Sequence, residues 1–215
     1  MTKKTDYILD ELEKIFPDAK CELIHSNPFE LVCAVSLSAQ TTDERVNMVT
    51  GELFKRYPTP NDLANADLDE VEDIIKSIGL YHNKALNLIA MAKKLVEDFD
   101  STVPSDIDSL CTLNGVGRKT ANVVRLVAFD IPSIPVDTHV SRVSKRLGLA
   151  NIDDDVSIIE KKLAKKVKKS RWNRMHHLFI FFGRYLCKAK NPECFRCPFK
   201  DICREFKAKK QTLNI

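Results

Sequence analysis

The stretch Leu113-Asn114-Gly115-Val116-Gly117-Arg118-Lys119-Thr120-Ala121-Asn122-Val123-Val124 places two closely spaced glycines between an apolar segment and a helix-forming pattern. Glycine has no Cβ and tolerates positive φ, so Gly115 and Gly117 predict a tight hairpin that feeds a helix. Backbone N–H groups at the start of that helix could approach an anion such as phosphate. Lys119 would lie on its first turn. The alternative is an ordinary helix-capping glycine followed by a surface lysine, because short glycine motifs are common.

Asp137 follows in Ile134-Pro135-Val136-Asp137-Thr138-His139-Val140, where its residue type predicts the N-cap of the next helix. Together with the hairpin, this segment resembles the endonuclease III family of helix-hairpin-helix DNA glycosylases, whose motif reads L-P-G-V-G-x-K-T-A and then V-D-T-H. Asn114 stands where the family usually has proline, which removes one preset φ angle but keeps both glycines. The resemblance extends from Asn27-Pro28-Phe29-Glu30 to Cys203.

Composition indicates a globular protein. The chain has 215 residues, 44% of them hydrophobic, with only 6 Gly and 9 Pro. It has no run of eighteen apolar residues, and Met1-Thr2-Lys3-Lys4 leads into an amphipathic segment without a signal-peptide core. We therefore expect a cytoplasmic, nucleoid-associated protein with no membrane partner, acting as a monomer.

Charge is distributed unevenly along the chain. Residues 1–132 carry 14 Lys and Arg against 22 Asp and Glu, a net charge of −8, whereas residues 133–215 carry 20 against 8, a net charge of +12. A basic half of this kind suits a polyanion such as DNA. The change of sign near residue 132 suggests two lobes.

Apolar residues recur at helical spacing and no stretch alternates with period two, so the sequence predicts an all-α protein. Asn27, Pro28 and Glu30 predict a capped helix start with a capping box. The resemblance implies two helical lobes with a DNA-binding and active-site cleft between them. It implies a six-helix domain over residues 22–132, and an iron–sulfur cluster domain formed by residues 1–21 together with residues 133–215.

Four cysteines near the end of the sequence have the most specific spacing in the chain: Cys187, Cys194, Cys197 and Cys203. Four thiolates can hold tetrahedral zinc or a [4Fe–4S] cluster. Zinc ribbons usually show two C-x2-C pairs and this chain has one. The spacing matches the cluster loop of the endonuclease III family, so we expect [4Fe–4S]. The loop cations would then face DNA phosphates; these are Lys188, Lys190, Arg196, Lys200 and Arg204.

The other three cysteines lie in apolar contexts. Free cysteine is among the most buried residue types, so Cys21, Cys33 and Cys111 are all expected in the core.

Gln40 and Leu80 acquire candidate roles from the resemblance. Gln40 lies on a predicted loop after a buried helix, and the matching family segment places its glutamine in the gap left by a flipped nucleotide. Leu80 follows Gly79, a candidate residue for ending a helix, so Leu80 could simply pack back on that helix. The resemblance offers the alternative that Leu80 inserts into the base stack.

The catalytic residues implied by the resemblance are Lys119 and Asp137. A free lysine has a pKa of about 10.4, so the helix start and partial burial would have to favour its neutral form. Lys119 would attack the sugar C1′, form a Schiff base and lead to β-elimination. Asp137 would stabilise the oxocarbenium-like sugar and assist deprotonation. The expected DNA contacts are Gln40, Leu80, Gly115, Val116, Gly117, Arg118 and His139, the last as a phosphate or structural contact.

The implied activity is excision of oxidised pyrimidines from duplex DNA in base excision repair, with strand cleavage at the abasic site. Two alternatives remain open. An adenine-mismatch glycosylase of the same superfamily lacks a lysine at the position of Lys119 and carries a further C-terminal domain. A non-catalytic DNA-binding module would need neither Lys119 nor Asp137.

Overall fold

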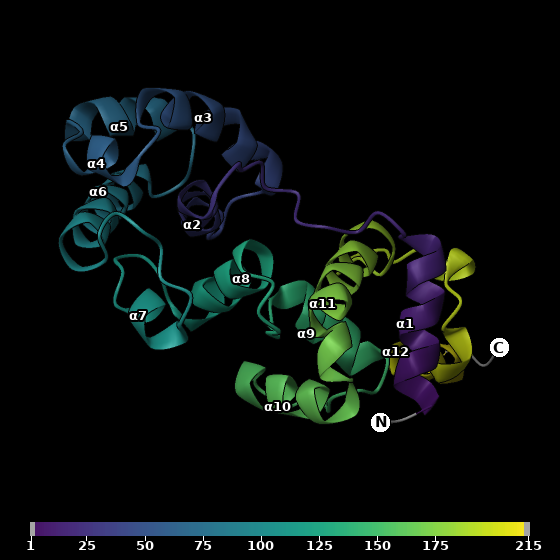
Figure 1. Ribbon diagram of the computed structural model, residues 1–215. Helices are drawn as coiled ribbons and strands as arrows, with labels where there is room; N and C mark the ends of the chain where they lie inside the picture. Colours follow the sequence, from purple (N-terminus) through teal and green to yellow (C-terminus); the bar gives the residue numbers. More distant parts are fainter. Residues whose placement is uncertain (1–2, 213–215) are drawn as a thin grey trace. The chain divides into compact units, whose positions relative to one another are not determined.

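The computed structural model describes residues 3–212, and all regular secondary structure among them is helical (Figure 1). This confirms the predicted all-α class. The twelve α-helices of this part of the chain are α1 Lys3–Ile15, α2 Pro28–Leu37, α3 Asp43–Arg56, α4 Pro60–Ala64, α5 Leu68–Ile75, α6 Tyr81–Asp98, α7 Ile107–Cys111, α8 Arg118–Ala128, α9 Thr138–Arg146, α10 Val156–Lys166, α11 Trp172–Phe181 and α12 Arg204–Thr212.

The chain forms two compact units. Unit 2 is Cys21–Ile131, and unit 1 joins Met1–Lys20 to Pro132–Ile215. These boundaries differ by one residue from those expected from the sequence. Unit 2 contains seven helices, α2 to α8, rather than six, and two of them have only five residues. Unit 1 has a net charge of +11 and unit 2 of −7.

Helix α2 lies at the centre of unit 2. Its side chains are apolar nearly all round, and α2 contacts α3, α6 and α8. The Asn27 side chain caps it by accepting a hydrogen bond from Glu30 N at 2.9 Å. The predicted capping box is not formed, because the Glu30 carboxylate accepts from Ser26 N at 2.6 Å instead of from Asn27 N.

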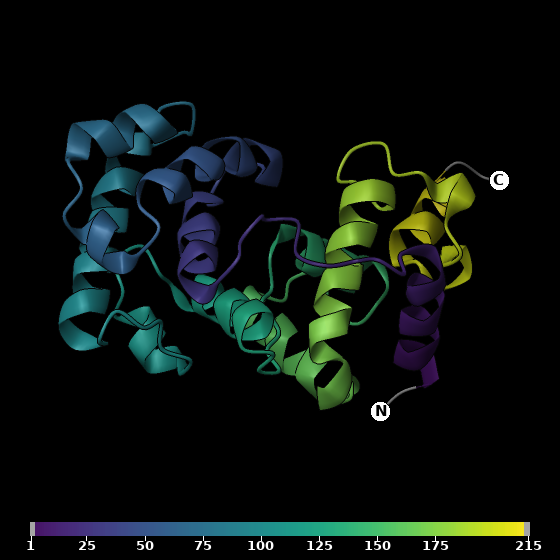
Figure 2. The same cartoon turned by 45° about the horizontal axis from the view of Figure 1, so that its top comes forward.

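Helix α1 belongs to the core of unit 1 although it is far away in sequence. Ile8, Leu9 and Leu12 are buried in an apolar cluster whose later members all follow residue 132. Figures 1 and 2 both show α1 beside the C-terminal segment, and the Tyr7 ring meets the Phe199 ring edge to face at 6.0 Å. The N-terminal helix therefore completes the C-terminal unit.

Arg174 on α11 fixes the end of α1. Its guanidinium makes two-pronged contact with the Glu13 carboxylate, at 2.7 and 2.8 Å. The same group also donates to the carbonyls of Phe16, Pro17 and Ala19, which follow α1. The Arg174 side chain therefore provides hydrogen-bond donors for the carbonyls of the turn after α1, which lie outside any helix.

The isolated cysteines behave differently from one another. Cys33 is fully buried, and burial raises the pKa of its thiol. Cys21 is half-buried. The expectation that Cys111 lies in the core is wrong, because Cys111 ends the short helix α7 on its exposed side while Leu110 takes the buried position.

Within residues 3–212, no helix has both the length and the apolar composition needed to cross a membrane.

We expect Arg174→Met to destabilise unit 1 by about 2 kcal/mol, because it removes several charge-assisted hydrogen bonds and leaves the turn carbonyls without their donor. The measurement is the urea midpoint of unfolding. Lys14→Met is the control: Lys14 forms one exposed ion pair with Glu11, so its loss should shift the urea midpoint much less. Equal shifts for the two variants would contradict this account of α1.

Candidate functional site

The hairpin between α7 and α8 forms as expected, and it is anchored by apolar side chains. Leu113 and Val116 are 2% and 4% exposed, and Val116 N donates to Leu113 O at 3.1 Å. Since the Val116 side chain lies in the core, its predicted contact with DNA is restricted to backbone atoms.

The two hairpin glycines serve different purposes. Gly115 has φ +74°, and a Cβ there would lie 3.2 Å from Asn87 Cβ on α6, so both the conformation and the packing require glycine. Gly117 has φ −85° and ψ 174°, with nothing within 4 Å of an added Cβ. The prediction that both glycines need unusual backbone freedom is therefore wrong for Gly117.

Gly117 is the N-cap of α8 and provides no side-chain hydrogen bond to its first turn. The open space at Gly117 lies at the positive end of the helix dipole, where an anion is stabilised. Lys119 is the second residue of α8 and its side chain is exposed. The expected partial burial of Lys119 is thus not provided by the protein itself, because α8 buries its opposite face through Ala121 and Val124.

Asp137 is the N-cap of α9, as predicted. Its Oδ1 accepts a hydrogen bond from Val140 N at 2.7 Å, which fixes the carboxylate at the start of the helix. Asp137 is half-buried and belongs to unit 1, whereas Lys119 belongs to unit 2.

His139 is packed against the π-helical turn Phe182–Leu186. A Cβ on Gly183 would lie 2.9 Å from the His139 Cβ, so the close approach requires glycine there. Arg142 Nη2 donates to His139 Nδ1 at 3.1 Å, and burial lowers the pKa of His139. These contacts support the structural role of His139.

Arg142 and Arg146, one turn apart on α9, hold the loop that carries the first cluster cysteine. Arg142 donates to Gly183 O at 2.6 Å and to Cys187 O at 3.0 Å. Arg146 donates to Lys188 O at 2.8 Å and to Cys187 Sγ at 3.4 Å, and it pairs with Glu205. The sequence does not mark either arginine for this role, because their spacing is also that of an ordinary charged helix face. Helix α9 therefore connects Asp137 with the cysteine loop.

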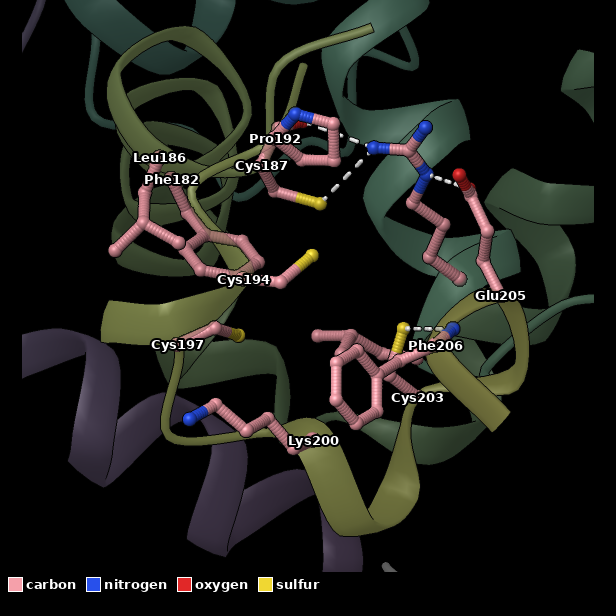
Figure 3. Close-up of a pocket in the computed structure, with 12 residues that line it drawn as sticks. Phe182, Leu186, Cys187, Pro192, Cys194, Cys197, Lys200, Cys203, Glu205 and Phe206 are labelled. Atoms are coloured by element: carbon pink, nitrogen blue, oxygen red, sulfur yellow. Dashed lines mark hydrogen bonds and ion pairs between the residues drawn. The ribbon is translucent and has the colours of Figure 1, made fainter. Parts of the chain in front are cut away.

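Four cysteines line one pocket of unit 1: Cys187, Cys194, Cys197 and Cys203. Their sulfur atoms point into a shared space (Figure 3). Phe182 and Phe199 are fully buried beside it, with ring centroids 5.4 Å apart. Backbone N–H groups reach two sulfurs at 3.5 Å, from Phe199 to Cys197 and from Phe206 to Cys203.

Burial in this pocket disfavours the thiolate form of two of the four cysteines, Cys187 and Cys197. Burial raises the pKa of Cys197 to about 11, and the neighbouring thiols act in the same direction. Burial also raises the pKa of Cys187, although Arg146 opposes the shift. Over residues 3–212, no three His, Cys, Asp or Glu side chains lie close enough to hold a single metal ion.

Several cations of the cysteine loop form ion pairs or hydrogen bonds within the folded chain. Glu193 pairs with Lys188 at 2.8 Å and with Arg196 at 3.0 Å. Lys200 donates to Phe195 O at 2.9 Å, and Arg204 donates to Ala150 O at 2.9 Å. Four of these five cations thus have partners in the folded chain, and their contact with DNA stays a prediction.

Gln40 and Leu80 come together with Gly115 around a cavity of about 190 Å³ in unit 2. Gln40 has φ 57° and Leu80 has φ 61°, a left-handed conformation that is costly for both residue types. Leu80 is 62% exposed, so it does not pack back on α5. It is Leu80, and not Gly79, that adopts positive φ at this turn.

Residues 33–169 match the family described as HhH-GPD superfamily base excision DNA repair protein. Endonuclease III of Bacillus subtilis (strain 168) is 54% identical over 203 residues, covering 94% of this chain and 93% of the relative. A trapped endonuclease III–DNA covalent intermediate, an estranged-adenine complex, matches with TM-score 0.92 and 54% identity, covering 97% of this chain and 99% of the other. A non-covalent endonuclease III–DNA complex matches with TM-score 0.93 and 52% identity, covering 98% and 100%.

The hairpin glycines provide a matched pair of variants. We expect Gly115→Ala to destabilise unit 2 by about 1–2 kcal/mol, because alanine disfavours positive φ and its Cβ would press on Asn87. Gly117→Ala should cost no more than about 0.5 kcal/mol: alanine is the weaker N-cap, but in this extended, open position its lower unfolded-state entropy offsets most of that loss. Urea unfolding of both variants is the measurement, and a larger loss for Gly117→Ala would refute this division of roles.

Proposed function

Because the chain belongs to the endonuclease III family of the HhH-GPD superfamily, we propose that it is a bifunctional DNA glycosylase and abasic-site lyase of base excision repair. The observation that carries this proposal is the start of α8. An N-cap with open space, suited to a phosphate, is followed two residues later by the exposed amine of Lys119. A DNA phosphate bound at this N-cap would also fix the position of the Lys119 amine relative to the strand.

Lys119 is proposed to attack C1′ of the damaged nucleotide once that nucleotide has left the base stack. The new Nζ–C1′ bond replaces the glycosidic C1′–N bond, and the base departs with its bonding electrons. The sugar ring then opens to give a Schiff base. Removal of a C2′ proton expels the 3′ oxygen, which cleaves the strand.

Asp137 is proposed to stabilise the positive charge that develops on the sugar and to take up a proton from the attacking amine. The hydrogen bond from Val140 N supports this role, because it fixes the carboxylate at the N-terminus of α9. Because this hydrogen bond already holds the Asp137 carboxylate, its negative charge can stabilise the sugar without a large rearrangement of the side chain.

The four pocket cysteines are proposed to hold a [4Fe–4S] cluster with a structural role. Their donor set fits, because four thiolates are the usual ligands of this group. The chain has a single C-x2-C pair, Cys194 and Cys197, whereas zinc ribbons usually have two, so the spacing favours the cluster over zinc. The N–H and guanidinium donors near the sulfurs would stabilise the negative charge of bound thiolates.

The substrate is proposed to be duplex DNA that contains an oxidised pyrimidine or an abasic site. Gln40 and Leu80 would enter the space left by the flipped nucleotide, and the exposure and left-handed backbone of Leu80 support this. The backbone of the hairpin, with Arg118, would contact the strand. Such an enzyme would work in the cytoplasm, at the nucleoid.

Borohydride trapping tests the proposed chemistry. We expect the wild-type protein to form a covalent adduct with DNA that carries an abasic site, because borohydride reduces a Schiff base to a stable amine. Lys119→Ala should form none, since it lacks the amine. Gel shift of the labelled strand is the measurement, and an adduct that persists in Lys119→Ala would sink the assignment.

Substrate choice separates the proposal from its rivals. Duplexes containing thymine glycol, an abasic site or an A·G mismatch should give incision of the first two and none of the third. Incision of the mismatch alone would favour an adenine-mismatch glycosylase. Binding without incision of any duplex would favour a DNA-binding module.

Replacing one pocket cysteine tests whether the four cysteines hold a [4Fe–4S] cluster. We expect the wild-type protein, purified without oxygen, to contain four iron and four acid-labile sulfide per chain, and Cys197→Ser to lose most of both. Cys111→Ser is the control, because Cys111 is exposed and lies outside the pocket. Stoichiometric zinc in place of iron in the wild-type protein would overturn the proposal.

A further inference from the structure

Lys84 is a buried lysine with no catalytic role in the reaction described above. It lies on the first turn of α6 and is only 9% exposed. Its Nζ donates to Leu37 O at 2.9 Å, to Ala39 O at 2.8 Å and to Thr41 Oγ1 at 2.9 Å. A lysine ammonium has three donors, so all three are used on neutral oxygens. Burying a charge is unfavourable unless its hydrogen bonds are satisfied, and here the bonds all go to one short segment.

That segment is the loop between α2 and α3, and it contains Gln40. The acceptors lie at the end of α2 and on both sides of Gln40, whose φ is 57°. A glutamine in the left-handed region is unfavourable by itself and persists only where neighbouring contacts determine it. The bonds to Ala39 and Thr41 are the contacts that flank this residue.

The same lysine is also tied to Leu80. Its backbone N donates to Leu80 O at 3.0 Å, which closes the first turn of α6. Six non-glycine residues in the described part of the chain have positive φ, and of these only Gln40 and Leu80 line the cavity that Lys84 also lines. Lys84 therefore links the two strained residues, one through its backbone and one through its side chain.

We infer that Lys84 is a positioning residue that fixes Gln40 relative to Leu80, so that both can enter the DNA duplex together. This inference rests on the proposed function, in which Gln40 and Leu80 occupy the gap left by the flipped nucleotide. Lys84 positions rather than catalyses, because all three of its ammonium donors are used on oxygens of the protein. The neutral acceptors suit this task, because a carboxylate partner would add negative charge beside the DNA.

The test compares Lys84→Met with Lys93→Met, which removes an exposed lysine from the same helix. Single-turnover rates are measured for excision of thymine glycol from a duplex and for cleavage of a duplex with a preformed abasic site. Opening the base stack is demanding for the first substrate and easier for the second, which has no base to unstack. We expect Lys84→Met to slow excision on the order of tenfold to a hundredfold, as small misplacements do, and abasic-site cleavage much less. Lys93→Met should match the wild type on both.

A double-mutant cycle separates positioning from general stability. If Lys84 acts through Gln40, Lys84→Met should slow excision far less in a Gln40→Ala background than in the wild type. Equal slowing in both backgrounds, or equal slowing of excision and abasic-site cleavage, would show that Lys84 only stabilises the fold. That result would overturn the inference.

Thr41→Val provides a second variant in case Lys84→Met does not fold. It removes one acceptor of Lys84 and keeps the side-chain shape, and it should slow excision selectively and to a smaller extent. No selective loss in Thr41→Val would count against the inference. Absence of any incision or trapped adduct in the wild type would instead refute the proposed function, so the two failures are distinguishable.

Discussion

The fold of unit 2 depends on the helical periodicity of α6, which decides which of its side chains lie on one face. Side chains three or four residues apart share one face of an α-helix. On α6 that face carries Lys84 and Asn87 after Leu80, the residue that caps the helix. Helix α6 also packs against α2, α4 and α5, which hold it in the core. Through Lys84 and Asn87 it contacts the α2–α3 loop and the α7–α8 hairpin, so both take their positions from it. The contact that Gly115 makes against Asn87 shows how little tolerance the arrangement has.

Unit 1 solves a different problem, which is how to stabilise an irregular loop. A segment that aims four sulfurs into one space cannot be a regular helix, so many of its carbonyls have no helical partner. Arg142 and Arg146 supply the missing donors from α9. Arginine suits this task because its donors lie in a rigid plane and can serve several acceptors at once. The same helix starts at Asp137, so the support of the loop and the orientation of that carboxylate share one element.

The sequence predicted those features that depend on neighbouring residues. Asp137 as an N-cap, the helix after Gly117 and the common pocket of the four cysteines all follow from short spacings. Features imposed by distant contacts were not predictable. Lys84 looks like a surface lysine in Tyr81-His82-Asn83-Lys84, and nothing local marks Gln40 as left-handed. Gly115 and Gly117 look alike in sequence, and only the folded chain distinguishes them, through the positive φ of Gly115 and its close approach to Asn87 on α6.

The pairing of Glu193 with two loop cations was missed for a related reason. Charge counting treats each lysine and arginine as available to DNA, whereas Glu193 holds Lys188 and Arg196 in the folded loop. The net charge of unit 1 therefore overstates the number of cations that are free of internal partners.

The division of unit 1 has a consequence during protein synthesis. The apolar residues of α1 leave the ribosome early, yet all their partners from the second segment follow residue 132. At roughly 5 to 20 residues per second, translation of the remaining chain takes about 10 to 40 s after residue 20. Unit 2 is complete in sequence well before then and can form its core first. Helix α1 is thus made before unit 2, yet its apolar face can be buried only after unit 2 has left the ribosome.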